Sequence, residues 1–98
     1  MNDNLTFLDG HRLTVYSSNG CPDCVRLKHW LDTQAVPHDE IKIDQNPEAA
    51  EKLERETGKQ AVPFILVNDS SWVRGYHNEE RTRLSEEKLL AELREALA

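Results

Sequence analysis

The stretch SSNGCPDCVRLKHWL, residues 17–31, contains both cysteines of the chain, Cys21 and Cys24. Two thiols separated by two residues can bind a metal, close a structural disulfide, or exchange electrons with another molecule. Pro22 suits the first position of a helix, which is predicted over residues 22–33. The apolar residues that recur at helical spacing, and so mark its apolar face, are Val25, Leu27, Trp30 and Leu31, with Cys24. Cys21 is therefore expected immediately before the start of a helix.

Composition and charge limit the class of protein. The 98 residues are 38% hydrophobic and 31% charged, which is typical of one small globular domain. The formal net charge of -6 argues against nucleic acid as the main partner, and no run approaches the roughly 18 apolar residues of a membrane span. The N-terminus lacks the basic and apolar regions of a signal peptide, so we expect a cytoplasmic protein. We also expect the chain to be a monomer. Thiols stay reduced in that compartment, which disfavours a purely structural disulfide.

The rest of the chain alternates between strand and helix patterns. Strands are expected over residues 12–17, 37–44, 61–68 and 72–75, and helices over residues 22–33, 47–57 and 86–97. Asn46, Gly58 and Ser85 provide end signals for the two later helices. The order β-α-β-α-β-β-α predicts an α/β fold in which helices flank a central four-stranded mixed sheet.

The first residues are harder to place. Residues 1–11 are expected to form an N-terminal extension to a domain over residues 12–98. The apolar residues of the extension are Leu5, Phe7 and Leu8. These side chains would be exposed if the extension were loose, so we expect it to be partly ordered. Asp9-Gly10, between apolar residues, is the alternative signal of a small extra hairpin.

The cysteine pair fits redox chemistry better than metal binding. Structural zinc usually takes four ligands in closely spaced pairs. No two of the four histidines are spaced as a second ligand pair, so no metal site is expected. The free N–H groups and the dipole of a helix start stabilise a thiolate at Cys21. Cys24, one turn further along, is placed to attack a mixed disulfide formed at Cys21.

A second signal lies far from the cysteines. Residues 61–68, AVPFILVN, form the most apolar run and are expected to be a central strand, yet they include Pro63. Proline removes a ladder hydrogen bond and is normally excluded from such a position. A cis bond before Pro63, at the head of the strand, would leave the preceding backbone free to pair with another chain.

Three segments, CPDC, TGKQAVP and RGYHNEE, resemble those of glutaredoxins, within the thioredoxin superfamily. The resemblance extends over about residues 13–97 and implies a thioredoxin-like fold for the glutaredoxin-like domain. It implies that Cys21 is the nucleophile, that Cys24 resolves the mixed disulfide, and that Pro63 is the cis-proline of the family. The backbone of Val62 would then pair with the bound thiol peptide.

The chain departs from the glutathione-binding pattern of that family. Ser18 stands in place of a lysine, Asp23 in place of a tyrosine, and Arg74-Gly75 followed by Tyr76 in place of a Gly-Gly pair followed by aspartate. CVRLK, residues 24–28, closely resembles the segment after the motif in mycoredoxins, which reduce mixed disulfides with mycothiol. Trp72 followed by Gly75 and Tyr76 is loosely similar to the signature of redoxins that serve ribonucleotide reductase. The contiguous mycoredoxin match carries more weight.

Charged residues near the motif are candidates for tuning the thiolate. Asp23 puts a negative charge beside Cys21 and partly offsets the lowering of its pKa. Arg26 and Lys28 lie on the same expected helix and restore positive potential. Pro22 stiffens the turn between the two cysteines.

Other residues are candidates for substrate binding. The set comprises Lys59, Gln60, Val62, Pro63, Arg74 and Gly75. The basic and polar members flank the expected groove, where they are candidates to hold a carboxylate of a small thiol. Arg74 is the preferred candidate, because the planar guanidinium of arginine matches a carboxylate.

These features predict a thiol–disulfide oxidoreductase that reduces protein disulfides, or mixed disulfides with a low-molecular-weight thiol, through the Cys21–Cys24 dithiol. The resemblance implies no tightly bound cofactor, with mycothiol, bacillithiol or glutathione as co-substrate and a flavin-dependent thiol reductase as electron source. Its partners would be proteins with disulfides or S-thiolated cysteines, and neither nucleic acid nor a membrane. Two alternatives stay open: a glutaredoxin that binds or transfers an iron–sulfur cluster, against which Pro22 argues, and a thioredoxin-reductase-fed electron donor to ribonucleotide reductase.

Overall fold

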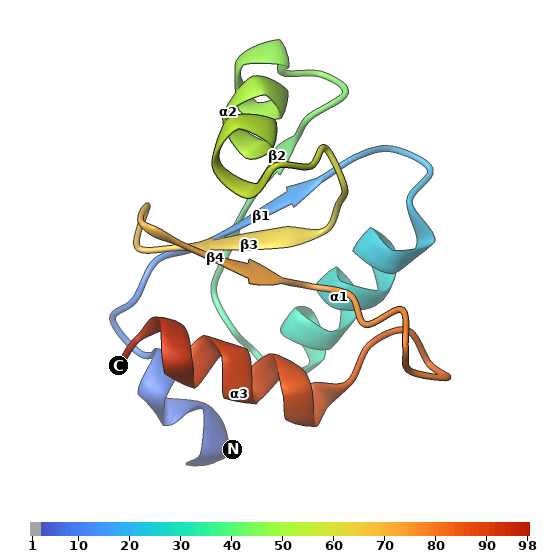
Figure 1. The fold of residues 1–98 in the computed structure, drawn as a ribbon. Helices are drawn as coiled ribbons and strands as arrows, with labels where there is room; N and C mark the ends of the chain where they lie inside the picture. Colours follow the sequence, from blue (N-terminus) through green and yellow to red (C-terminus); the bar gives the residue numbers. More distant parts are fainter. Residues whose placement is uncertain (1–2) are drawn as a thin grey trace.

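The computed structural model describes residues 3–98 and shows the expected alternation of strands and helices (Figure 1). A 3-10 helix, η1 (Asp3–Leu8), comes first. The remaining elements are β1 (Leu13–Ser17), α1 (Pro22–Thr33), β2 (Asp39–Lys42), α2 (Pro47–Thr57), β3 (Phe64–Val67), β4 (Ser71–Arg74) and α3 (Glu86–Ala96). Within this described part of the chain, none of the helices combines the length and apolar character needed to cross a bilayer.

The strands form one four-stranded sheet in the order β2-β1-β3-β4, which confirms the predicted mixed sheet. β1 and β2 are parallel and are joined through α1, whereas β3 is antiparallel to both β1 and β4. β1 therefore ends, β3 begins and β4 ends at the same end of the sheet, on the right in Figure 1. This end brings together three segments that are distant in sequence: residues 18–21, 61–63 and 75–85.

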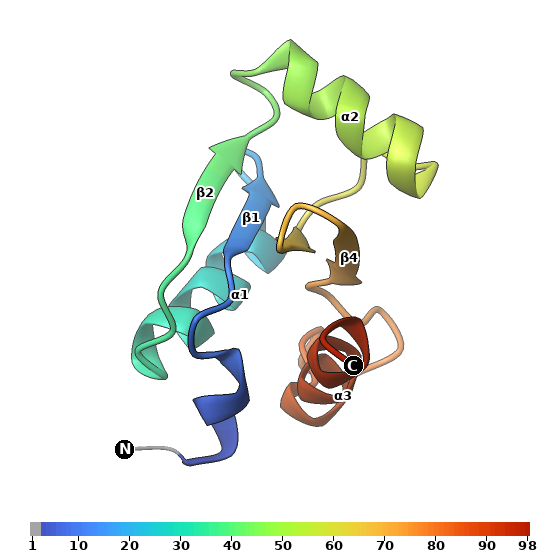
Figure 2. The same cartoon turned by 90° about the vertical axis from the view of Figure 1, so that its left-hand side faces the viewer.

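Helices cover both faces of the sheet. Figure 2 shows α2 on one side of the strands and η1, α1 and α3 on the other. Leu13, Val15, Ile65 and Val67 belong to the core on the α1 and α3 side, whereas Tyr16, Phe64 and Leu66 belong to the core under α2. The alternation along β1 and β3 is the period of two expected for strands buried on both faces.

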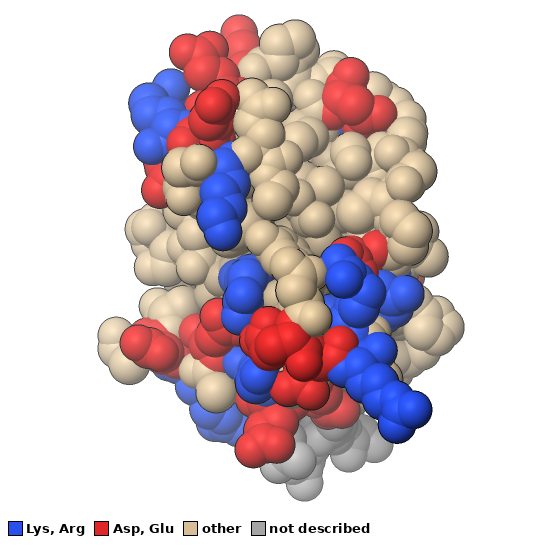
Figure 3. Space-filling model, turned by 45° about the vertical axis from the view of Figure 1, so that its right-hand side comes forward, with Lys and Arg blue, Asp and Glu red and all other residues tan. Residues whose placement is uncertain are grey.

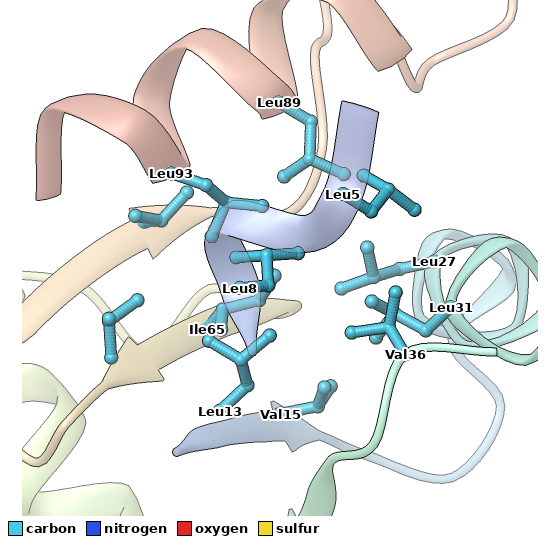
Figure 4. Packing of buried hydrophobic residues seen from close by; sticks show 12 residues of the cluster. Leu5, Leu8, Leu13, Val15, Leu27, Leu31, Val36, Ile65, Leu89 and Leu93 are labelled. Atoms are coloured by element: carbon cyan, nitrogen blue, oxygen red, sulfur yellow. The ribbon is translucent and has the colours of Figure 1, made fainter. Parts of the chain in front are cut away.

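The N-terminal segment contributes to the larger core. Figure 4 shows Leu5 and Leu8 of η1 among the leucines of α1 and α3. Each of the two side chains is 6% exposed. Asp9 and Gly10 form a turn after η1, so these residues do not build the alternative hairpin. Of the expected extension over residues 1–11, the first two lie outside the described residues, and the division of the chain at residue 12 stays a prediction.

The predicted ends of the later helices are confirmed. Asn46 Oδ1 accepts a hydrogen bond of 3.1 Å from Ala49 N at the start of α2, and Gly58 ends that helix with a left-handed φ of 81°. Ser85 Oγ accepts a hydrogen bond of 3.2 Å from Lys88 N at the start of α3. These contacts satisfy backbone groups that have no partner inside the helix.

Some boundaries and one burial differ from the prediction. β2 is shorter than residues 37–44, because β1 ends at Ser17 opposite Lys42. β3 begins only at Phe64 instead of residue 61, because Pro63 has no N–H to donate to a neighbouring strand. β4 ends at Arg74, and the next residue, Gly75, donates its backbone N–H to the carbonyl oxygen of Pro63. Val25, expected on the apolar face of α1, is 64% exposed.

Candidate active site

Cys21 and Cys24 form a disulfide at the start of α1. Cys21 is the N-cap residue of this helix, and its Sγ accepts a hydrogen bond of 3.1 Å from Cys24 N. Cys24 is 1% exposed, whereas Cys21 is only half-buried. The N–H groups of the helix start stabilise a thiolate at Cys21 when the disulfide is reduced. Cys21 is therefore the more accessible of the two cysteines.

The segment before β3 lies against Cys21. The Val62 carbonyl oxygen is 3.9 Å from Cys21 Sγ, and the Val62–Pro63 peptide bond is cis, as predicted. Gly75 N donates a hydrogen bond of 3.0 Å to Pro63 O. A Cβ atom at Gly75 would be 2.6 Å from Leu27 Cδ2 and 3.2 Å from Pro63 Cγ, so the close approach requires glycine. The structure thus brings the Val62 carbonyl to Cys21 and packs Gly75 against the adjoining Pro63.

The carboxylate of Asp23 is paired with two guanidinium groups. Arg83 binds both of its oxygens, at 2.9 Å from Nε and 2.8 Å from Nη2, and Arg26 Nη1 donates to Oδ1 at 2.6 Å. The hydrogen bonds from Arg83 lower the pKa of Asp23 most, burial opposes them, and the charges of Arg83 and Arg26 add to the lowering. Asp23 is therefore not an isolated charge beside Cys21, and Arg26 binds this carboxylate. Sequence reasoning missed Arg83, which is 60 residues away.

Two of the three polar candidates for substrate binding, Arg74 and Gln60, form hydrogen bonds within this chain, and the third, Lys59, is exposed to solvent. Arg74 Nη2 donates to Glu79 Oε1 at 3.3 Å. Gln60 Nε2 donates to Glu54 Oε2 on α2 at 2.8 Å. Lys59 is exposed to solvent. Arg74 and Gln60 are thus each engaged with a carboxylate of this chain.

The loop over residues 75–85 is anchored by a buried histidine that sequence reasoning also missed. His77 is fully buried, and its backbone N donates to Arg83 O at 2.7 Å. Ser85 N donates to His77 Nδ1 at 3.2 Å, which makes Nδ1 an acceptor and assigns the ring proton to Nε2. Nε2 then donates to Glu92 Oε2 at 3.0 Å. A single histidine in a polar loop gives no sequence signal for this role.

A polar network joins the end of β1 to α1 and β2. Ser17 Oγ and Lys28 Nζ each donate to Glu40 Oε2 at 2.6 Å, and Ser17 is fully buried. Burial raises the pKa of Glu40, but the hydrogen bonds from Lys28 and Ser17 outweigh it and hold that pKa below its usual value. Lys28, expected to add positive potential near the thiolate, is therefore paired with Glu40.

Uncharged residues form part of the surface around the disulfide, apart from the charged group of Asp23, Arg26 and Arg83. Pro22 and Val25 are exposed and Ala61 and Val62 are half-buried. Figure 3 turns the right-hand side of Figure 1 towards the viewer. A broad uncharged area lies on this face, and acidic and basic side chains gather below it. Among residues 3–98, no three histidine, cysteine, aspartate or glutamate side chains are grouped so that they could hold a metal ion.

A disulfide at a helix start, next to a cis-proline segment at one end of a mixed four-stranded sheet, defines a redox protein of the thioredoxin type. The family model of glutaredoxin matches residues 13–72, so the chain belongs to the glutaredoxin family. The chain is accordingly a thiol–disulfide oxidoreductase with a thioredoxin-like fold.

Individual relatives support this assignment. The chain is 38% identical over 73 residues to the glutaredoxin-like protein NrdH of Lactococcus lactis subsp. lactis (strain IL1403), with 74% of this chain and 99% of that protein aligned. The structure of NrdH-redoxin from Escherichia coli is similar with a TM-score of 0.59 and 28% identity, over 76% of this chain and 95% of that one. A glutaredoxin from Archaeoglobus fulgidus also has a TM-score of 0.59, at 27% identity, over 85% of this chain and 95% of that one.

Proposed function

We propose that this chain reduces disulfides of protein partners directly with its own dithiol. The Cys21 thiolate attacks one sulfur of the target disulfide, which breaks the target S–S bond, forms a mixed disulfide and releases one target thiolate. The Cys24 thiolate then attacks Cys21 Sγ, which releases the second target thiolate and closes the Cys21–Cys24 disulfide. Both released thiolates take up protons from water. Two electrons have passed to the target, and a flavin-dependent thiol reductase supplies two others that reduce the Cys21–Cys24 disulfide again.

One observation carries the proposal: Cys21, which is half-buried, is bonded to Cys24, which is 1% exposed. The exposed partner suits attack on a large substrate, because a protein disulfide cannot reach Cys24. The buried partner suits resolution, because it attacks within the same molecule and needs no external thiol.

The surroundings of Cys21 support a protein substrate. A partner segment would lie along the backbone of Val62, beside Pro63 and Gly75, and pair as an added strand. Val25 is 64% exposed one helical turn from Cys21, which offers apolar contact area to such a partner. We assign the cycle to the cytoplasm, where thiols are kept reduced.

The polar contacts favour a protein substrate over a small thiol. A small thiol such as glutathione is held largely by its carboxylates, and Arg74 and Gln60 already bind Glu79 and Glu54. Lys59 is the exposed candidate for that role. The structure of Escherichia coli NrdH-redoxin is reported with a thioredoxin-like activity profile, which also supports direct protein reduction. Mycothiol, bacillithiol and glutathione stay predicted co-substrates that the following assay compares with a reductase.

The test measures both halves of the cycle with purified protein. Prereduced chain is mixed with insulin, or with a ribonucleotide reductase disulfide, and target thiols are counted without any added thiol. The oxidised chain is then offered NADPH with a flavin-dependent thioredoxin reductase, or each of the three small thiols. We expect stoichiometric target reduction and faster recharging by the reductase. Recharging by a small thiol alone would contradict the proposal, and Cys21→Ser serves as the inactive control.

A further inference from the structure

Arg83 is fixed by contacts at both its backbone and its side chain. The guanidinium binds Asp23 through hydrogen bonds of 2.8 and 2.9 Å, and the carbonyl oxygen accepts one of 2.7 Å from His77 N. The backbone is left-handed with a φ of 63°, which residues other than glycine adopt rarely. Buried contacts of His77 with Ser85 and Glu92 hold the same loop. The loop therefore presents Arg83 to the first turn of α1.

Asp23 is the acidic residue of the helical turn that begins at Cys21. Its side chain is only 16% exposed, so water screens its charge incompletely. A carboxylate there opposes ionisation of the neighbouring thiol, and each guanidinium bound to it offsets part of that effect.

We propose that Arg83 is a positioning residue for disulfide exchange: by binding both oxygens of Asp23, it offsets the charge of that carboxylate and keeps the Cys21 thiol easily ionised. The inference rests on the proposed function only in taking Cys21 as the nucleophile. It assigns the loop after β4 a part in setting the reactivity of a cysteine on α1, in addition to its packing against Pro63.

Asp23 is bound by Arg26 within α1 as well as by Arg83, and the other charged groups near this end of the sheet form separate contacts. Lys42 and Asp44 bind Asn19 in the loop between β1 and α1. Lys88 binds Glu79 and Glu80, and Glu79 also binds Arg74. Lys59 is exposed to solvent, three residues before Val62. Among these contacts, the Asp23–Arg83 pair links the cysteine-bearing turn to the loop after β4. Its loss leaves Asp23 with Arg26 alone.

The experiment measures the pKa of Cys21 from the pH dependence of iodoacetamide alkylation. It uses the full chain with Cys24→Ser, so that one thiol reacts. Arg83→Met should raise the Cys21 pKa by about 0.5, which slows alkylation roughly threefold at pH values below that pKa. Arg83→Lys, which keeps the charge, should restore part of the difference. Arg81→Met removes the same charge from an exposed position in the same loop and should leave the pKa unchanged.

A double-mutant cycle shows whether Arg83 acts through Asp23. With Asp23→Asn in place, Arg83→Met should change the Cys21 pKa much less, because the amide no longer holds the guanidinium beside the first turn of α1. An equal rise with and without Asp23 would overturn the proposal, as would a fall in thermal stability with no change in pKa. If Arg83→Met does not fold, Arg83→Lys and Asp23→Asn decide alone: the first must raise the Cys21 pKa and the second must not. Alkylation of Cys21 needs no partner protein. If the proposed function fails, the turnover assay shows it, and the measured Cys21 pKa still tests the role of Arg83.

Discussion

Alanine in place of Gly75 should destabilise the fold and slow disulfide exchange, because the added methyl group has no room. Its Cβ would lie 2.6 Å from Leu27 Cδ2 and 3.2 Å from both Cγ and the carbonyl oxygen of Pro63. Leu27 is fully buried and has no free space to move into, so Pro63 must move as well. Overpacking of this kind costs about 1–3 kcal/mol. The displacement also breaks the 3.9 Å approach of the Val62 carbonyl oxygen to Cys21 Sγ.

Two assays separate the effects on stability and on the site. Urea unfolding at pH 7 gives the free energy of unfolding, and single-turnover reduction of insulin by the prereduced chain gives the exchange rate. We expect Gly75→Ala to lose about 1–3 kcal/mol of stability and about tenfold in rate. Gly58→Ala is the matched control, because its φ of 81° makes alanine costly, about 1–2 kcal/mol, although nothing lies within 4 Å of the new Cβ. Its exchange rate should equal that of the wild type.

A compensating substitution tests the steric reasoning directly. Leu27→Val shortens the side chain that the new methyl group meets, so Gly75→Ala combined with Leu27→Val should recover part of the exchange rate. Wild-type stability and rate in Gly75→Ala, or a double variant as slow as Gly75→Ala alone, would refute the reasoning.

Three further outcomes follow from single contacts. Asp23→Asn should cost about 0.5–1 kcal/mol at pH 7, because pairing with Arg83 depresses the pKa of Asp23 and so stabilises the fold above pH 4. That contribution is lost as the pH falls through the folded-state pKa, so urea unfolding should show the two proteins converging at about pH 2–3, and a constant difference would contradict the assignment. Leu8→Ala should cost about 2–4 kcal/mol by the same measurement with no change in Cys21 alkylation, and unchanged stability would mean that η1 contributes nothing to the core. Ser85→Ala should cost about 1 kcal/mol through loss of the α3 cap, and unaltered unfolding would show that this cap is dispensable.

The parts of the site that could be predicted are those marked within their own segments. Cys21 precedes a proline that suits the first position of a helix, and Cys24 follows at the spacing of one turn. Pro63 stands in an apolar run where a ladder-forming residue is expected, which signals its unusual position. These assignments needed no knowledge of how distant segments meet.

Contacts between distant segments could not be predicted. Nothing in the sequence around Asp23 or Arg83 marks either residue as the partner of the other. Each could equally pair with several other residues of opposite charge. The helical pattern also misplaced Val25, which directly follows the buried Cys24 and so lies about 100° around α1 from it. The buried stripe runs through Cys24, Leu27 and Leu31, which leaves Val25 beside it, facing solvent.

Trapping of the mixed disulfide tests the division of labour between the cysteines most directly. Cys24→Ser and Cys21→Ser are each mixed in reduced form with a protein disulfide, and adducts are identified by mass spectrometry without reduction. Because Cys24 is 1% exposed and Cys21 is half-buried, Cys24→Ser should accumulate a covalent adduct at Cys21, and Cys21→Ser should form none. An adduct at Cys24 in Cys21→Ser, with none in Cys24→Ser, would contradict the account.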